Sequence, residues 1–197
     1  MSIEHDCLTY VISIVAGLSV GDIFLRSDEN GENRFHKPHQ HFVENEPQSD
    51  LFKLLAAIGA YLAAKDKNAF CRDFFLNEKM MKEIEKLRNQ LIEIMKGLQL
   101  DLKWKDGKMK PPTAEQKVLL RQIFLSGLID KVARLEDEQP KDKNLPLYST
   151  MFINSPVKIH PNSSLFDVRP PPKYIIYGQV QESNQGNNIF IKGNLLD

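Results

Sequence analysis

The chain has 197 residues, of which 42% are hydrophobic and 26% charged, a composition typical of a globular protein rather than a disordered one. Its 26 basic residues balance 26 acidic ones, which argues against a dedicated nucleic-acid-binding protein, because such proteins usually carry a basic excess. Any affinity for nucleic acid is therefore expected to come from local patches or from a larger protein that contains this chain. The two cysteines, Cys7 and Cys71, fit no metal-ligand or redox spacing and are expected to be reduced, buried thiols of an intracellular protein.

The first expected element is a helix over residues 7–24 that is apolar on nearly every side. Its most apolar part, residues 8–20, is too short to span a bilayer. Glu4 and Asp6 precede it, where a secretory signal would carry Lys or Arg. A helix without a polar face needs neighbours all around it, and the sequence supplies none before it. The chain is therefore expected to be a piece of a larger domain.

Two more helices are predicted beyond a long polar loop over residues 26–48. Ser49 or Asp50 is the expected cap of the first, which has one apolar face. Asn77 is the expected cap of the second, which runs to about Gly97. Apolar residues of this second helix recur at intervals of four and three, which predicts a seam that packs along another helix. The seam residues are Met80, Ile84, Leu87, Leu91, Ile94 and Leu98.

A further helix is predicted after a linker over residues 101–112. The segment Thr113-Ala114-Glu115-Gln116 has the form of a capping box, in which two side chains satisfy each other's backbone N–H groups. Apolar residues then recur at helical spacing to about Leu135, where this helix is expected to end. The charged, proline-containing segment 136–146 closes the helical part.

The hydrophobic pattern changes to alternation beyond this point and predicts about three strands. The strands are expected near residues 157–160, 173–180 and 188–192, with turns at 161–164 and 184–187. A three-stranded sheet is marginally stable by itself, so the chain is expected to end before the sheet closes.

Several short motifs occur in a defined order along most of the chain. They are Leu18-Ser19-Val20 after an apolar helix, Phe35-His36-Lys37-Pro38, Phe70-Cys71, Arg88 with Gln90-Leu91, Ser126-Gly127-Leu128, and the long run from Ile159 to Phe166 followed by Tyr174-Ile175-Ile176-Tyr177. In this order they resemble the C-terminal region of the DEAH-box RNA helicases. Pro111-Pro112-Thr113 and the run from Leu128 to Ala133 are most similar to the nucleolar branch that acts in ribosome biogenesis.

The resemblance implies an α+β fold class, in which a helicase-associated, ratchet-like helical domain is followed by a partial OB-like β module. The expected boundaries are 1–138 for the helical domain, 139–156 for a linker and 157–197 for the OB-like module. Two segments depart from the family pattern. Pro170-Pro171-Pro172 stands where the family usually has a Pro-Glu pair, and Gly178-Gln179 replaces a His/Gln-Glu pair.

In that family these domains pack on the motor domains, close the RNA exit path and relay regulation by partner proteins. For this chain the resemblance implies an accessory role in RNA binding and motor regulation, in small-subunit ribosomal RNA processing. The implied partners are RNA, the motor domains and regulatory proteins, with no membrane, and the implied location is the nucleus and nucleolus. The alternative is a stand-alone protein-interaction module that docks a partner on the seam and has no RNA role.

The chain contains neither the Gly-x-x-x-x-Gly-Lys-Ser/Thr motif nor the Asp-Glu-Ala-His motif of the parent family. ATP hydrolysis needs a loop of backbone N–H groups for the phosphates and an acidic residue for Mg²⁺. The chain by itself is therefore expected to hold no cofactor and to hydrolyse no ATP. ATP and Mg²⁺ belong to the motor of the parent helicase.

Five residues could be considered as zinc ligands: His5, His36, His39, His41 and Cys71. Their spacing matches no closed structural zinc site. A polar loop anchored by Phe35 and Phe42 is the preferred interpretation, so no metal site is expected.

One candidate RNA-binding group lies on the predicted helix that begins after Asn77. Lys79, Lys82 and Lys86 fall on one face of this helix and could meet a phosphate backbone. Glu83 and Glu85 lie among them, so the sequence alone favours an ordinary solvated face, and only the resemblance raises the expectation of RNA binding.

The second candidate group lies in the predicted β module, where charges, hydroxyls and aromatic rings occur together. It consists of Lys158, His160, Ser163, Ser164, Lys173, Tyr174 and Tyr177. OB-like surfaces bind single strands with such groups, bases on aromatic rings and phosphates on Lys and Ser. In the alternative interpretation the tyrosines pack inside and His160 only shapes a turn. Both interpretations stay open for His160 and Tyr177, and the lysines and serines are the better RNA candidates.

Overall fold

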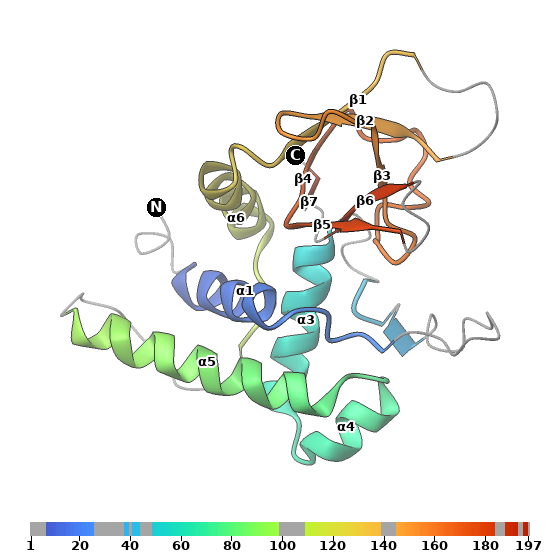
Figure 1. Cartoon of the computed structure of the whole chain (residues 1–197). Coiled ribbons are helices and arrows are strands. Elements are labelled where there is room, and N and C mark those ends of the chain that lie inside the picture. Colours follow the sequence, from blue (N-terminus) through green and yellow to red (C-terminus); the bar gives the residue numbers. More distant parts are fainter. Residues whose placement is uncertain are drawn as a thin grey trace. The chain divides into compact units, whose positions relative to one another are not determined.

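The computed structural model describes residues 7–25, 38–39, 41–43, 49–98, 109–138, 145–183, 188–192 and 195–196 (Figure 1). The predicted loop over residues 26–48, the linker over 101–112 and the turn at 184–187 lie wholly or largely outside these ranges. The chain divides into two units, which we name the helical unit (Met1–Asn45 and Lys53–Leu120) and the sheet unit (Glu46–Phe52 and Arg121–Asp197). The α+β fold class expected from the sequence is confirmed.

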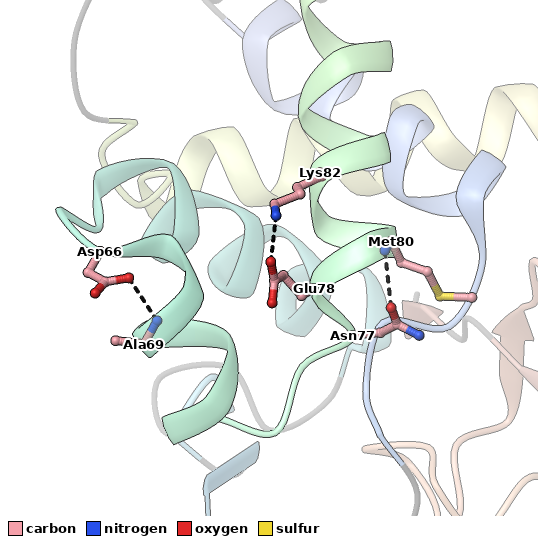
Figure 2. Close-up of polar contacts among 6 residues, drawn as sticks. All are labelled: Asp66, Ala69, Asn77, Glu78, Met80 and Lys82. Carbon is pink, nitrogen blue, oxygen red and sulfur yellow. Dashed lines mark hydrogen bonds and ion pairs between the residues drawn. The ribbon is translucent and has the colours of Figure 1, made fainter.

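Five helices are present in the described residues, and side-chain caps explain where most of them begin. They are α1 (Leu8–Val20), α3 (Asp50–Ala63), α4 (Lys67–Asp73), α5 (Glu78–Gly97) and α6 (Ala114–Gly127). Ser49 caps α3 by accepting the N–H of Phe52 at 3.2 Å. Figure 2 shows the corresponding bonds of α4 and α5, from Ala69 N–H to Asp66 and from Met80 N–H to Asn77. Each cap satisfies a backbone N–H that a helix leaves without an internal partner.

The predicted capping box at the start of α6 is confirmed. The N–H of Gln116 donates to Thr113 Oγ1 at 3.2 Å, and the N–H of Thr113 donates to Gln116 Oε1 at 3.0 Å. This reciprocal pair explains why α6 begins directly after the proline pair at 111–112, although propensity alone would start it less sharply.

Packing of α1 against α3 and α5 forms the core of the helical unit, and α1 lies alongside α5 (Figure 1). Gly17 permits a close approach of α3, because a Cβ at this position would lie 2.8 Å from Leu54 Cδ2. The predicted seam of α5 is confirmed only in its first part. Ile84 is buried, and Leu87 and Leu91 pack against the core. Further along, Ile94 and Leu98 are each 61% exposed, so the apolar pattern extends beyond the contact.

Among its described residues, the sheet unit contains seven strands in the order β5-β6-β3-β2-β1-β4-β7. They are β1 (Val132–Leu135), β2 (Leu147–Thr150), β3 (Val157–Ile159), β4 (Tyr174–Ile176), β5 (Gln179–Glu182), β6 (Ile189–Lys192) and β7 (Leu195–Leu196). All neighbouring strands are antiparallel except β3 and β6, which are parallel. The predicted count of about three strands is therefore wrong.

Two strands lie where the sequence analysis expects other structure. The helix predicted to reach Leu135 ends at Gly127, and residues 132–135 form β1 between β2 and β4. β2 lies inside the expected linker 139–156. Helical spacing of apolar residues continued past Gly127, but Ala133 alternates with exposed Arg134 and is fully buried in the sheet core. Pairing on both sides overrides the local propensity of such a short segment.

The core of the sheet unit is made by inward-facing residues of five strands. Its fully buried members include Ala133, Tyr148, Val157, Ile175 and Ile191. The hydroxyl of Tyr148 donates to the carbonyl of Pro172 at 3.0 Å, which satisfies a polar group in this apolar setting.

In the described part of the chain, no helix combines the length and the apolarity needed to cross a bilayer.

Ile84→Ala is expected to lower the free energy of unfolding by about 2–5 kcal/mol, because it removes a fully buried side chain from the helical core. The matched control is Ile94→Ala on the same helix, which is expected to stay within about 0.5 kcal/mol of the parent because Ile94 is mostly exposed. Urea unfolding followed by circular dichroism measures both. Equal effects of the two substitutions would contradict the described packing of α5.

Burial raises the pKa of the Tyr148 phenol to about 12. The unfolded phenol ionises near pH 10, so its contribution to stability is complete below pH 10 and is lost as pH rises toward 12. Tyr148→Phe is expected to cost about 1 kcal/mol at pH 7 through the lost hydrogen bond. The variant is expected to lose less stability than the parent between pH 10 and pH 12. Urea unfolding at pH 7, 10 and 11.5 measures this difference, and parallel losses in both proteins would contradict it.

Candidate nucleic-acid interface

The most tightly bonded part of the candidate site is the loop after β3. Ser163 Oγ donates to Asp50 Oδ2 at 2.8 Å, and Ser164 donates to Asp50 Oδ1 through its backbone N–H at 2.7 Å and its hydroxyl at 2.9 Å. We call this arrangement the Asp50 clasp. The N–H of Leu165 donates in turn to Ser163 Oγ at 3.1 Å, which fixes that hydroxyl in place.

The Asp50 clasp belongs wholly to the sheet unit, because Glu46–Phe52 is part of that unit. Asp50 is the first residue of α3, where Ser49 and not Asp50 provides the cap. The carboxylate of Asp50 therefore accepts hydrogen bonds from the loop after β3. These serines are predicted from the sequence as phosphate donors, and in the structure they donate to an internal carboxylate.

Lys158 and His160 lie on and just after β3, next to β6. Lys158 Nζ donates to Asn188 Oδ1 at 2.7 Å. The Nδ1 atom of His160 accepts the N–H of Asn162 at 3.1 Å, and the His160 ring stands edge-on to Phe190 with 5.6 Å between centroids. The parallel register places Phe190 opposite Lys158. A cation, an imidazole and an aromatic ring thus lie together on neighbouring strands.

Lys173 and Tyr174 form an exposed pair at the start of β4. Tyr174 is 42% exposed, and Lys173 Nζ lies 5.7 Å from the centroid of its ring. Tyr177 is only 4% exposed and belongs to the core of the sheet unit. This burial agrees with the interpretation in which this tyrosine packs inside. The alternation of the strand thus places Tyr174 and Tyr177 in different surroundings.

Lys79, Lys82 and Lys86 are all exposed on α5 in the helical unit. Lys82 pairs with Glu78 one turn away (Figure 2), and Glu85 pairs with Lys67 of α4. The face is therefore mixed in charge, as the glutamates in the sequence indicate. An open hollow runs along this helix beside two of the lysines. It is lined by Lys82, Glu85, Lys86, Leu87, Asn89, Gln90, Leu91, Glu93 and Ile94.

Sequence reasoning missed one exposed apolar pair in the sheet unit. Met151 and Phe152 directly follow β2 and are 74% and 68% exposed. The only signal was the sequence Met-Phe itself, which lies in a segment expected to be a linker. Sequence reasoning also gave no role to Lys131, whose Nζ donates to the carbonyl of Gly178 at 3.3 Å.

The ring of His39 contacts an aromatic side chain and a backbone carbonyl of the helical unit. Its ring lies edge-on to Phe24 with 4.9 Å between centroids, and Nε2 lies 3.2 Å from the carbonyl oxygen of Phe75. Burial lowers the pKa of His39, although its backbone hydrogen bond with Phe75 acts in the opposite direction. Among the described residues, no three His, Cys, Asp or Glu side chains are grouped to hold a metal ion. His5 and His36 lie outside those residues.

Two family models match the chain, one in each half. The model of the helicase associated domain (HA2), ratchet-like, matches residues 1–54. The model of the oligonucleotide/oligosaccharide-binding (OB)-fold matches residues 120–193. The second match begins within α6 and contains β1 to β6, so β1 and β2 lie inside the segment that the OB-fold model covers.

Curated relatives match over nearly the whole chain. The Probable ATP-dependent RNA helicase DHX37 of Homo sapiens is 31% identical over 98% of this chain and 18% of its own length. The Probable ATP-dependent RNA helicase DHR1 of Saccharomyces cerevisiae is 29% identical over 100% of this chain and 20% of its own length. The Probable ATP-dependent RNA helicase kurz of Drosophila melanogaster is 30% identical over 98% and 18%.

The chain thus spans about a fifth of the length of these relatives. The order of the two matched domains, helical and then OB-fold, agrees with the order of the helical and sheet units. The resemblance drawn from the sequence motifs is confirmed by both findings. The chain belongs to the DEAH-box RNA helicase family, to its C-terminal helicase-associated and OB-fold region in the group that includes DHX37, DHR1 and kurz.

Proposed function

We propose that this chain contributes to RNA binding and to regulation of the motor in a DEAH-box helicase, as an accessory and non-catalytic region. The observation that carries the RNA-binding part is the exposed pair of Lys173 and Tyr174 on a sheet of the OB-fold family. An exposed aromatic ring beside a cation is the combination with which OB folds stack bases and neutralise phosphates. The domain organisation we propose is a helicase-associated domain followed by an OB domain.

Lys158 and His160 provide a second point of contact in the same unit. Lys158 is half-buried and already bonded to Asn188, so it would reach a phosphate with its remaining donors. His160 presents its ring beside Phe190. Ser163 and Ser164 remain in the proposed site, although their hydroxyls now donate to Asp50. Tyr177 would support the surface from inside, since it packs in the core.

Lys79, Lys82 and Lys86 are proposed as a weaker, helical contribution. All three are exposed; Lys82 pairs with Glu78 of the same helix, while the neighbouring Glu85 pairs with Lys67 of α4. An exposed ion pair of this kind contributes little to stability, so Lys82 can exchange Glu78 for a phosphate at low cost.

For the biological role we propose small-subunit ribosomal RNA processing in the nucleolus. The similarity of Pro111-Pro112-Thr113 and of residues 128–133 to the ribosome-biogenesis branch supports this role. The relatives are themselves named as ATP-dependent RNA helicases, which makes RNA and the motor domains the first proposed partners. Regulatory protein partners are proposed from the same resemblance.

The double substitution Lys173→Gln with Tyr174→Ala is expected to weaken binding of a short single-stranded RNA by about 5- to 150-fold, because one stacking contact contributes about 1–3 kcal/mol. Fluorescence anisotropy with a labelled 12-nucleotide RNA measures this change. Binding by the parent chain should also fall steeply as salt increases.

The matched control is Lys96→Gln. Lys96 is an exposed lysine that pairs with Glu93 and lies outside the proposed site, so its loss changes net charge equally. An equal effect of the control, or binding that does not depend on salt, would contradict the proposed phosphate and base contacts.

Ultraviolet crosslinking in cells is expected to recover small-subunit precursor RNA with the helicase that contains this region, and less of it with the Lys173→Gln, Tyr174→Ala variant. Recovery of other RNA classes in equal amounts would contradict the ribosomal role. Retention of the motor half in a pull-down, with no RNA binding, would favour the alternative of a protein-interaction module.

A further inference from the structure

The three donors of the Asp50 clasp converge on one anion. The Oγ atoms of Ser163 and Ser164 and the backbone N–H of Ser164 all lie 2.7–2.9 Å from carboxylate oxygens of Asp50. Hydrogen bonds to an ionised acceptor are shorter and stronger than neutral ones, and these lengths fit that class. Backbone N–H groups in turns are also known to form concavities that hold anions.

The arrangement of the donors does not depend on Asp50 alone. Ser163 Oγ is held by the N–H of Leu165, and the N–H of Ser163 donates to the carbonyl of His160 at 2.9 Å. Leu165 is fully buried in the core of the sheet unit, and this burial anchors the loop. The loop therefore keeps its donors directed to one point by its own bonds.

The site is also accessible. Ser163, Ser164 and Asp50 are half-buried, and Pro161 and Asn162 beside them are exposed. His160, three residues before Ser163, belongs to the proposed RNA surface together with Lys158. An RNA strand bound along this surface would reach the same loop.

We propose that the loop at Ser163–Ser164 is a receptor for an RNA backbone phosphate and that Asp50 is its internal competitor. The proposal rests on the RNA-binding function proposed above. A phosphate diester carries one negative charge on two free oxygens, as a carboxylate does, so it can accept the same three bonds. Asp50 then occupies the receptor in the absence of RNA, and a bound phosphate replaces it. The competition lowers the affinity for RNA and makes binding dependent on release of the first residue of α3.

The test uses Asp50→Asn, which preserves size but removes the charge of the competitor. Single-stranded RNA is expected to bind this variant at least about threefold more tightly than the parent, because the three donors no longer bind a charged internal competitor. The dependence of log K on log salt should steepen by about 0.7, the amount for one added phosphate contact on a single strand. Adding Ser164→Ala to Asp50→Asn should remove both gains.

Asp167→Asn is the matched control, because Asp167 is an exposed carboxylate in the same loop with no bond to the clasp. If Asp50→Asn and Asp167→Asn change affinity and salt dependence equally, the effect is general electrostatics and the receptor proposal is wrong. Urea unfolding of each variant in parallel establishes that it is folded.

A second readout separates this proposal from the RNA-binding function on which it rests. Inorganic phosphate is expected to raise the Tm of Asp50→Asn relative to chloride at equal ionic strength, and to leave the Tm of Asp167→Asn unchanged. If no variant binds RNA but phosphate still stabilises Asp50→Asn, the loop is an anion receptor and the RNA function fails. If RNA binds but neither readout responds to Asp50→Asn, the receptor proposal alone is overturned.

Discussion

A half-buried carboxylate needs partners, and the way in which Asp50 obtains them organises the candidate site. Asp50 begins α3, but the adjacent Ser49 already accepts the helix N–H, so the carboxylate accepts three bonds from the loop after β3. The same bonds hold the two serines in one orientation above the buried Leu165. Whether the loop donors are available to another anion therefore depends on this one charged group.

The alternation of the sheet decides which of the other candidate residues can meet a ligand. Ile175 and Tyr177 face the core of the sheet unit, whereas Tyr174 is exposed beside Lys173. Ile176, on the same face as Tyr174, is also buried, so the exposure of Tyr174 depends on its place at the start of β4 as well as on the register that pairing with β1 and β7 sets. Aromatic content alone therefore could not rank the two tyrosines.

The elements that local chemistry controls were predicted best. The caps at Asn77 and Thr113 locate two helix starts because one side chain satisfies one neighbouring N–H group, three residues away. The sheet was predicted poorly: β1 continued a helical spacing of apolar residues, and β2 lay in the segment expected to be a linker, just after its charged part. Each of these strands has four residues and is stabilised by pairing with distant segments, which leaves little local signal.

The sequence by itself determined the α+β class and the helix starts at Asn77 and Thr113, because these depend on residue type and short spacing, and its ordered motifs carried the resemblance to the family. Only the tertiary structure decided that Tyr177 is core and Tyr174 is surface, and that Ser163 and Ser164 bind a carboxylate 113 and 114 residues away. Such contacts depend on which segments fold next to each other. The candidate RNA-binding residues of the sheet unit thus fall into three groups. They are an exposed pair at the start of β4, two residues next to β6, and a loop whose hydrogen-bond donors already bind a carboxylate.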